Sequence, residues 1–372
     1  MAEKRVVIAG FGDTGVLVAA HLKSSCEITA ISPKPALVSG QELGTRLSDP
    51  ELWKQNYLFT YDRYRALDKV TVLHGKLSGM DPEAKTSNVT LADGSTQTLP
   101  YDALVLATGT TNGFWRTAEM ESLADITDDI HQRAADMAGA ETLAIIGGGP
   151  SGVSVASNLK LTYPDKKVHL FCSRELPLPD YHPDTRKRIA AKLAEQGVVI
   201  HPNHRAEIPQ GGDGQAVTSG VVRFVDGHED FVADRIIWTV GACRPNNEGI
   251  APSCLDADGF VRVDDYLRVL DTDGVFAIGD IAATDPHRSS ARNAGFYQAA
   301  RNVDAYLRGK PRRMKKFKPP GVKWGSILGL QNDGLTIYSP KGKPFRLSRR
   351  FTQGFLLPVI VWRVIYRGIR KV

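Results

Sequence analysis

Two glycine-rich turns, far apart in the chain, constrain its fold more than any other feature. Gly10-Phe11-Gly12-Asp13-Thr14-Gly15 follows the apolar run at 6–9, and Gly147-Gly148-Gly149-Pro150-Ser151-Gly152 follows the apolar run at 143–146. Each run is typical of a buried parallel strand, and each turn opens a segment of helical character. In such a unit the glycines allow a tight turn and the approach of a pyrophosphate to a helix N-terminus. The sequence therefore predicts two dinucleotide sites. One includes Gly10, Phe11, Gly12, Asp13, Thr14 and Gly15, and the other Gly147, Gly149, Pro150, Ser151 and Gly152.

Strand signals alternate with helical stretches through most of the chain, which indicates an α/β fold with parallel sheets. Strands are expected at 27–32, at 101–106 before Ala107-Thr108-Gly109, at 168–172, at 233–238 before Thr239-Val240-Gly241, and at 274–278 before Gly279-Asp280. A hairpin is expected to turn at Asp93-Gly94. We predict two Rossmann-like dinucleotide-binding domains, the second inserted into the first. The first comprises 1–115 and 250–308, the second 116–249, and 309–372 form a small basic C-terminal region.

The net charge of +6 is unevenly distributed along the chain. From Arg301 onward there are 18 lysines and arginines against two acidic residues, so the preceding 300 residues carry an excess of acids. This asymmetry predicts a separate partner for the C-terminal region.

The four cysteines, Cys26, Cys172, Cys243 and Cys254, form no closely spaced pair. This spacing argues against a zinc site, a disulfide framework and the dithiol of a disulfide reductase. With no apolar signal segment at the start, we expect a cytoplasmic protein that can lie at a membrane face.

Together the two turns, the Ala-Thr-Gly at 107–109 and the segment 272–280 resemble the two-dinucleotide-domain flavoproteins over roughly 300 residues. Within them the chain is most similar to the type II NADH:quinone oxidoreductases and the ferroptosis-suppressor group. The segments 255–264 and 328–334 add to this resemblance. It implies FAD in the first domain and NADH or NADPH in the second. It also implies that Asp280 binds the ribityl chain of FAD, that Arg46 pairs with a phosphate, and that the Leu77 backbone lies at the adenine. No catalytic side chain is expected, because hydride passes between the two cofactors directly.

Several positions depart from the family pattern. Ser32 stands where an acidic residue normally holds the adenosine ribose of FAD. In the second domain the equivalent position is Cys172, and Ser173 and Arg174 follow it. Because no carboxylate stands there to repel a 2′-phosphate and an arginine is near, this sequence favours acceptance of NADPH. The alternative is that Arg174 only faces solvent. Ser154 replaces an acidic residue expected on the nicotinamide side. His201 and His204 form a short His-x-x-His pair that we interpret as surface residues rather than metal ligands. We interpret His287 as a loop residue, and the alternative is that it lines the edge of the flavin.

The segment 355–372 is both apolar and basic. On a helix, Arg363, Arg367 and Arg370 would share one face, Ile360, Val361, Val364 and Ile365 the other, with Trp362 and Tyr366 flanking them. This pattern is typical of an interfacial helix on anionic lipid, and seven positive charges at 308–318 add to it. The alternative is that the apolar face packs on the body or in a homodimer. If the segment is only an anchor, deleting it should leave reduction of a soluble quinone intact.

The sequence therefore predicts an FAD-dependent NAD(P)H:quinone oxidoreductase. Two alternatives stay open: reduction of a small electron-carrier protein, and a flavoprotein that acts by binding nucleic acid or a protein partner through the basic tail. The bulky aliphatic residues among the tail's charges favour lipid over nucleic acid.

Overall fold

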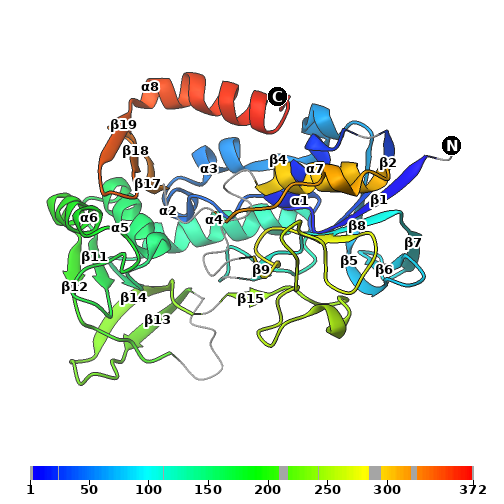
Figure 1. The fold of residues 1–372 in the computed structure, drawn as a ribbon. Helices are drawn as coiled ribbons and strands as arrows, with labels where there is room; N and C mark the ends of the chain where they lie inside the picture. The colour runs from blue at the N-terminus through cyan, green and yellow to red at the C-terminus, as the bar shows by residue number, and fades with distance from the viewer. Residues whose placement is uncertain are drawn as a thin grey trace.

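The computed structural model describes residues 3–23, 25–111, 113–208, 217–241, 243–284, 295–319 and 325–370 (Figure 1). Two sheets, each covered by helices, form two neighbouring α/β units, and the C-terminal helix runs along the edge of both. The predicted α/β class with two Rossmann-like domains, one inserted into the other, is confirmed. Within the described residues no helix has the length and apolar character needed to cross a membrane.

The first domain is built on a seven-stranded sheet in the order β16-β8-β1-β2-β5-β6-β7. Its first five strands are parallel, and β5, β6 and β7 pair antiparallel. The predicted hairpin between β6 and β7 is present, and Gly94 takes the left-handed conformation at φ 83° that its turn requires. The strands are β1 (Lys4–Ala9), β2 (Cys26–Ser32), β5 (Val70–Asp81), β6 (Thr86–Leu91), β7 (Thr96–Pro100), β8 (Ala103–Leu106) and β16 (Val275–Ala277).

Helices α1 (Asp13–His21) and α7 (Gly295–Leu307) pack together in the core of this domain. The α7 helix has no counterpart among our sequence predictions. Smaller elements lie between β2 and β5: β3 (Ala36–Val38), α2 (Leu43–Ser48), α3 (Pro50–Tyr57), β4 (Leu58–Thr60), η1 (Tyr61–Arg63) and η2 (Arg65–Leu67).

The second domain has a five-stranded sheet in the order β12-β11-β10-β14-β13. It contains α4 (Leu123–Gly139), β10 (Thr142–Ile146), α5 (Pro150–Thr162), β11 (Lys167–Phe171), α6 (Pro183–Gln196), β12 (Val199–His201), β13 (Val217–Val222) and β14 (Phe231–Trp238). The chain enters through β9 (Thr110–Thr111) and returns through β15 (Arg244–Pro245), which pair antiparallel. The two segments that connect the domains therefore lie side by side. Short helices η3 (Pro252–Cys254) and η4 (Pro311–Arg313) follow later in the chain.

The C-terminal region begins with a three-stranded sheet of β17 (Gly325–Gln331), β18 (Gly334–Tyr338) and β19 (Pro344–Leu347). It docks on α5, where Asn158 Nδ2 donates to the Leu328 carbonyl at 2.9 Å and Gln331 Nε2 lies 2.6 Å from Ser157 Oγ. Asn158 and Ser157 are buried, so these bonds specify the docking. The 328–334 segment, which carried part of the family resemblance, is thus the contact between this sheet and the second domain.

From this sheet the chain crosses back to the first domain through α8 (Arg349–Phe351) and the wide π-type helix η5 (Thr352–Ile365), along the top of Figure 1. At its far end Trp362, Ile365, Tyr366 and Ile369 pack against the core of the first domain. The C-terminal segment is therefore part of the folded body.

This packing corrects the predicted division of the tail into two faces. The helix ends at Ile365, and Arg367 lies beyond it with φ 55°, so Arg363, Arg367 and Arg370 do not share one helical face. Arg370 instead pairs with Asp68 at 2.7 Å, while Tyr366 points inward. The cause is tertiary: the aromatic and aliphatic side chains at the end of the tail find apolar surface on the first domain.

Candidate functional site

The first glycine turn opens into a cavity of about 860 Å³ at the carboxyl ends of the first sheet's parallel strands. This is where open α/β sheets bind ligands. Most residues predicted for the first site line it: Gly10, Phe11, Gly12, Asp13, Thr14, Ser32, Leu77, Ala107, Thr108, Gly109 and Asp280. Gly15, Gly279 and Arg46 do not. Gly15 lies behind the turn, and Gly279 is close to Thr14.

Two glycines show why this turn can hold a phosphate group. Gly10 has φ 91°, and a Cβ there would lie 2.4 Å from the carbonyl oxygen of Ala107. Gly12, just before α1, has nothing within 4 Å of where a Cβ would be. The space beside Gly12 therefore lies at a helix N-terminus, where free N–H groups attract anions.

Ser32 ends β2 inside the cavity, but its hydroxyl is already engaged. Ser32 Oγ lies 2.9 Å from Tyr61 Oη and accepts from the Lys34 backbone N–H at 3.2 Å. Lys34, which sequence reasoning missed, also lines the cavity and pairs with Glu121. Burial lowers the pKa of Lys34 to about 8. The sequence signal that could have identified Lys34 is a basic residue two positions after the end of β2.

The cation beside Asp280 is Arg116, which was not among the predicted residues. Arg116 Nη1 donates to Asp280 Oδ2 at 2.8 Å, and both residues line the cavity. Arg46 is 5 % exposed within α2; its guanidinium donates to the Trp115 carbonyl at 3.3 Å and pairs with Asp129 at 3.4 Å. Burial lowers the pKa of Arg46 to about 10. Arg46, predicted as a phosphate contact, does not line the cavity, because α2 turns this side chain toward α4.

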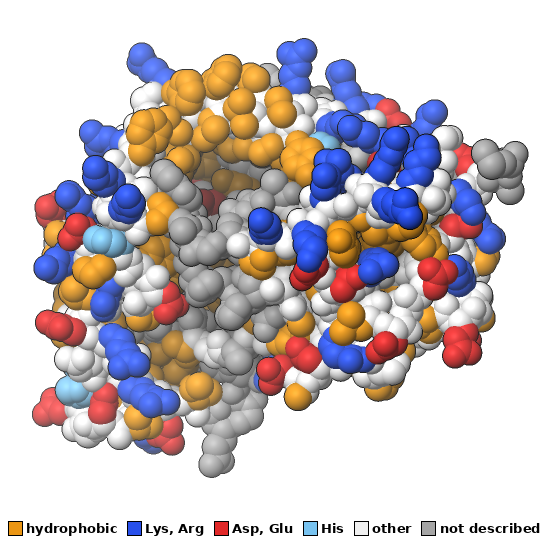
Figure 2. All heavy atoms as spheres, in the orientation of Figure 1, with side chains coloured by type: hydrophobic (Ala, Val, Ile, Leu, Met, Phe, Trp, Pro, Cys, Tyr) orange, Lys and Arg blue, Asp and Glu red, His pale blue; other side chains and the backbone are white. Residues whose placement is uncertain are grey.

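Part of the cavity wall is apolar, and the C-terminal segment contributes to it. Leu17 of α1, Phe296 of α7, and Val361, Ile365 and Tyr366 of the tail line it. No local pattern in the sequence indicated that residues 361–366 would meet the first glycine turn. Figure 2 shows the outer side of this region: apolar side chains gather along the top of the molecule, basic side chains flank them, and the surface is hollowed beneath.

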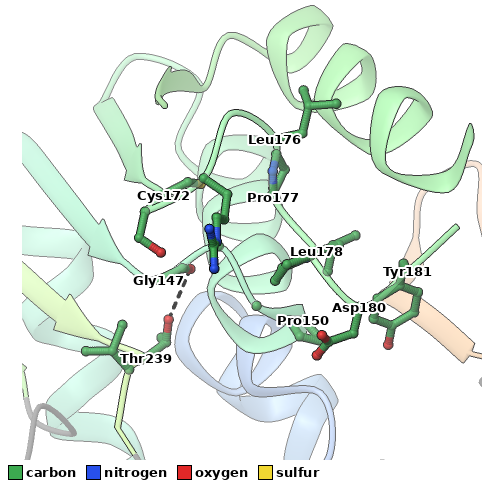
Figure 3. A pocket seen from close by; sticks show the side chains of 15 residues that line it. Gly147, Pro150, Cys172, Leu176, Pro177, Leu178, Asp180, Tyr181 and Thr239 are labelled. Atoms are coloured by element: carbon green, nitrogen blue, oxygen red, sulfur yellow. Dashed lines mark hydrogen bonds between the residues drawn. The ribbon is translucent and has the colours of Figure 1, made fainter. Parts of the chain in front are cut away.

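The second glycine turn borders a smaller cavity of about 200 Å³ (Figure 3). Of the residues predicted here, Gly147, Gly149, Pro150, Ser173 and Arg174 line it, whereas Ser151, Gly152 and Gly241 do not. Thr239 donates to the carbonyl of Gly147 at 3.3 Å, the dashed line in Figure 3. A Cβ on Gly152 would lie 2.0 Å from the Gly147 carbonyl oxygen, so this glycine serves strand–helix packing.

A loop at 176–181, absent from our predictions, forms the outer wall of the second cavity. Figure 3 shows Pro177 and Leu178 above the start of α5. Arg186 holds this loop by donating to the carbonyls of Leu176 and Pro177 at 2.8 and 3.1 Å. Cys172 is buried against Gly148, and burial raises the pKa of its thiol to about 12. Ser173 and Arg174 are exposed at the rim, where no carboxylate ends β11.

The position of Ser154 in the fold explains why the acidic residue of the family pattern is absent from the nicotinamide side. Ser154 is buried where α5 meets α2, and a Cβ on Gly44 would lie 2.4 Å from the Ser154 carbonyl oxygen and 2.7 Å from its hydroxyl. The close contact between the two helices leaves room for a small side chain only.

His201 and His204 belong to a cluster with His169 and His228 at the edge of the second sheet. His169 Nδ1 lies 2.9 Å from His201 Nε2, and the rings of His204 and His228 stack at 3.7 Å. Among the described residues no group of three or more His, Cys, Asp or Glu side chains is arranged to hold a metal ion. His287 lies outside the described residues.

This cluster predicts a loss of stability in mild acid. Burial lowers the pKa of His169 and lowers that of His201 to about 4. Because an unfolded histidine titrates near 6.5, the stabilisation is complete above pH about 6.5 and is lost as the pH falls toward 4. We expect His201→Phe to remove about 1–2 kcal/mol of the difference in unfolding free energy between pH 7.5 and pH 5, allowing for solvent screening. Urea unfolding at both pH values measures it; an unchanged pH dependence would contradict it.

Residues 4–302 match the family model of the pyridine nucleotide-disulphide oxidoreductases. The chain belongs to this family. It is 27 % identical over 293 residues to ferroptosis suppressor protein 1 of Mus musculus, a match covering 74 % of each chain. It is 26 % identical over 362 residues to apoptosis-inducing factor homolog B of Dictyostelium discoideum, covering 91 % of this chain and 90 % of the relative. NDH2 of Plasmodium falciparum has the same fold, with a TM-score of 0.72, 14 % identity, and coverage of 98 % and 96 %.

The family binds FAD and uses NAD(P)H, and this chain is an FAD-dependent NAD(P)H oxidoreductase. The resemblance to the ferroptosis-suppressor group and to NDH2 is confirmed. The residues fit both FAD and NAD(P)H. The open space at Gly12 and the open space at Gly149 each lie before a helix N-terminus, and each suits one pyrophosphate. The four cysteines are free.

Proposed function

We propose that this protein passes a hydride from NAD(P)H to FAD and then two electrons to a quinone. The observation that carries the choice of acceptor is the apolar part of the larger cavity's wall, formed by Leu17, Phe296, Val361 and Ile365. A quinone ring with its apolar chain matches such a lining, since burial of apolar surface drives binding. A small carrier protein would need an exposed docking face beside the cavity, and here residues of η5 form part of the apolar wall.

When bound, FAD accepts a hydride and supplies two electrons. The protein's own contribution is to bind, orient and exclude water. Arg116 and the N-terminus of α1 supply positive charge in the first cavity. Asp280 supplies an acceptor for hydroxyl groups. The tail residues Val361 and Ile365 exclude water from the apolar part of the cavity.

An anaerobic titration with NADH and then NADPH, followed near 450 nm, tests the proposal. We expect either nucleotide to bleach the flavin and a short-chain quinone to restore the absorbance. Reoxidation by a carrier protein but not by quinone would favour the first alternative. A yellow protein that neither nucleotide bleaches would favour a binding role.

For the electron donor, we propose that NADPH is accepted through Arg174. An arginine–phosphate contact contributes about 1.5–3 kcal/mol, so Arg174→Ala should raise KM for NADPH about 10- to 100-fold and leave KM for NADH within about twofold. Lys187→Ala, which removes an exposed cation on α6 outside the cavity, is the matched control. Equal changes for both nucleotides would mean that Arg174 only faces solvent.

We also propose that η5 contacts an anionic membrane. Phe351 and Phe355 are each 44 % exposed on the outer side of the tail, and Arg363 is exposed nearby. The double variant Phe351→Ser/Phe355→Ser should cut co-flotation with phosphatidylserine vesicles about tenfold or more, whereas Val232→Ser, on β14, should not. A DNA mobility shift at matched salt without vesicle binding would instead favour the nucleic-acid alternative.

A further inference from the structure

Asp13 places a carboxylate in the first nucleotide site. It is the first residue of α1, directly after Gly12, and it lines the larger cavity. A carboxylate at a helix N-terminus stabilises the helix, but it competes with a phosphate for the same N–H groups and repels it. An FAD pyrophosphate can occupy this helix N-terminus only if the Asp13 carboxylate is held and its charge is partly compensated.

Two hydroxyl groups from elsewhere in the chain hold the Asp13 carboxylate and partly compensate its charge. Tyr366 Oη donates to Asp13 Oδ1 at 2.6 Å, and Ser39 Oγ donates to Asp13 Oδ2 at 3.1 Å. Each carboxylate oxygen thus receives one hydrogen bond. Burial raises the pKa of Tyr366 well above its ordinary value, so the phenol keeps the proton that it donates.

Tyr366 is itself firmly placed. Its ring lies 5.5 Å from that of Tyr64, its backbone N–H donates to the Val361 carbonyl at 2.9 Å, and it lines the cavity. The segment after it is tied down separately: the Arg65 N–H donates to the Gly368 carbonyl at 3.0 Å, and Arg370 pairs with Asp68. The loss of the Tyr366 hydroxyl would therefore leave the tail docked.

We propose that Tyr366 is a positioning residue of the flavin site, whose hydroxyl holds the Asp13 carboxylate so that the N-terminus of α1 is free for the pyrophosphate. The C-terminal segment then forms part of the wall of the FAD site, and flavin retention depends on it. The proposal rests on FAD occupying the first domain, and it does not depend on the acceptor.

The test is FAD binding to flavin-free protein. Tyr366→Phe keeps the packed ring and should weaken FAD binding about tenfold or more, as expected for a hydrogen bond to a charged group. Tyr64→Phe is the matched control, because the buried Tyr64 hydroxyl has no hydrogen-bond partner in the described part of the chain. It should change FAD binding less than about twofold.

Asp13→Asn separates positioning from a general structural role. If the Tyr366 hydroxyl acts by restraining a negative charge, Tyr366→Phe should have little effect in the Asp13→Asn background. ADP, which carries the pyrophosphate without the flavin ring, should show the same pattern. Ser39→Ala, which removes the second donor without touching the tail, should also weaken FAD and ADP binding.

Unchanged FAD binding by Tyr366→Phe, or equal losses in the presence and absence of Asp13, would overturn the proposal. Should Tyr366→Phe impair folding, Ser39→Ala with and without Asp13→Asn decides it by the same comparison. A wild-type protein that binds FAD but does not reduce quinone would overturn only the proposed acceptor. One that binds neither FAD nor ADP would overturn the flavin assignment and this proposal together.

Discussion

Replacing Gly12 by alanine is expected to give a folded protein that has lost most of its flavin, whereas Gly149→Ala should give a yellow protein that NAD(P)H bleaches poorly. At both positions a Cβ would have nothing within 4 Å in the structure, so the fold should tolerate it. The added methyl group would instead occupy the space beside a helix N-terminus, where each pyrophosphate is expected.

The size of this effect follows from overpacking. Inserting a methyl group into a filled site costs about 1–3 kcal/mol, which corresponds to roughly 10- to 100-fold weaker binding. Flavin content, FAD titration of flavin-free protein and the rate of anaerobic bleaching measure it. Each variant is the control for the other, because Gly12→Ala should weaken the binding of FAD and Gly149→Ala the binding of NAD(P)H. Wild-type flavin content in Gly12→Ala, or wild-type bleaching in Gly149→Ala, would contradict the assignment of that turn.

Truncation of the chain after Ser348 should release the flavin and destabilise the first domain. Trp362, Ile365, Tyr366 and Ile369 pack on the core of that domain, and their partial burial contributes on the order of 4 kcal/mol. The truncation also removes the Tyr366–Asp13 hydrogen bond and the tail residues that line the cavity. Loss of the flavin would show that the tail is structural, whereas a tail that is only an anchor could be deleted without loss of activity.

Urea unfolding of the flavin-free protein and the temperature of flavin release measure this effect. The matched control is Phe351→Ser/Phe355→Ser, which changes the exposed side of the same segment and should keep both flavin and stability. A truncated protein with full flavin content and unchanged activity on a soluble quinone would show that the tail is only a membrane anchor.

Local patterns were reliable where a few neighbouring residues decide the structure. The strand–glycine–helix units at 10–15 and 147–152 were predictable, because each requires a short apolar run, a turn with little room for side chains, and a helix start within about ten residues. The hairpin at Asp93-Gly94 followed for the same reason.

Residue contacts across long sequence separations were not predictable. Arg46 was matched to a family position that pairs with a phosphate, but only the fold shows that α2 turns its side chain toward Asp129. The pairing of Arg116 with Asp280 had no signal in the sequence. Ser154 was seen as a missing acid, but only the close contact of α2 with α5 at Gly44 shows why a small residue stands there.

The sequence by itself thus determined the α/β class, the two glycine turns and the basic, apolar character of the C-terminus, because these depend on short-range sterics and composition. Only the tertiary structure decided what the tail contacts. A helical pattern specifies that an apolar face must be buried, but lipid, a second subunit and the chain's own core all satisfy that requirement. The tail packs on the core of the first domain, which it contacts at residues more than 290 positions away in the sequence. One of these residues is Asp13, whose carboxylate accepts a hydrogen bond from Tyr366.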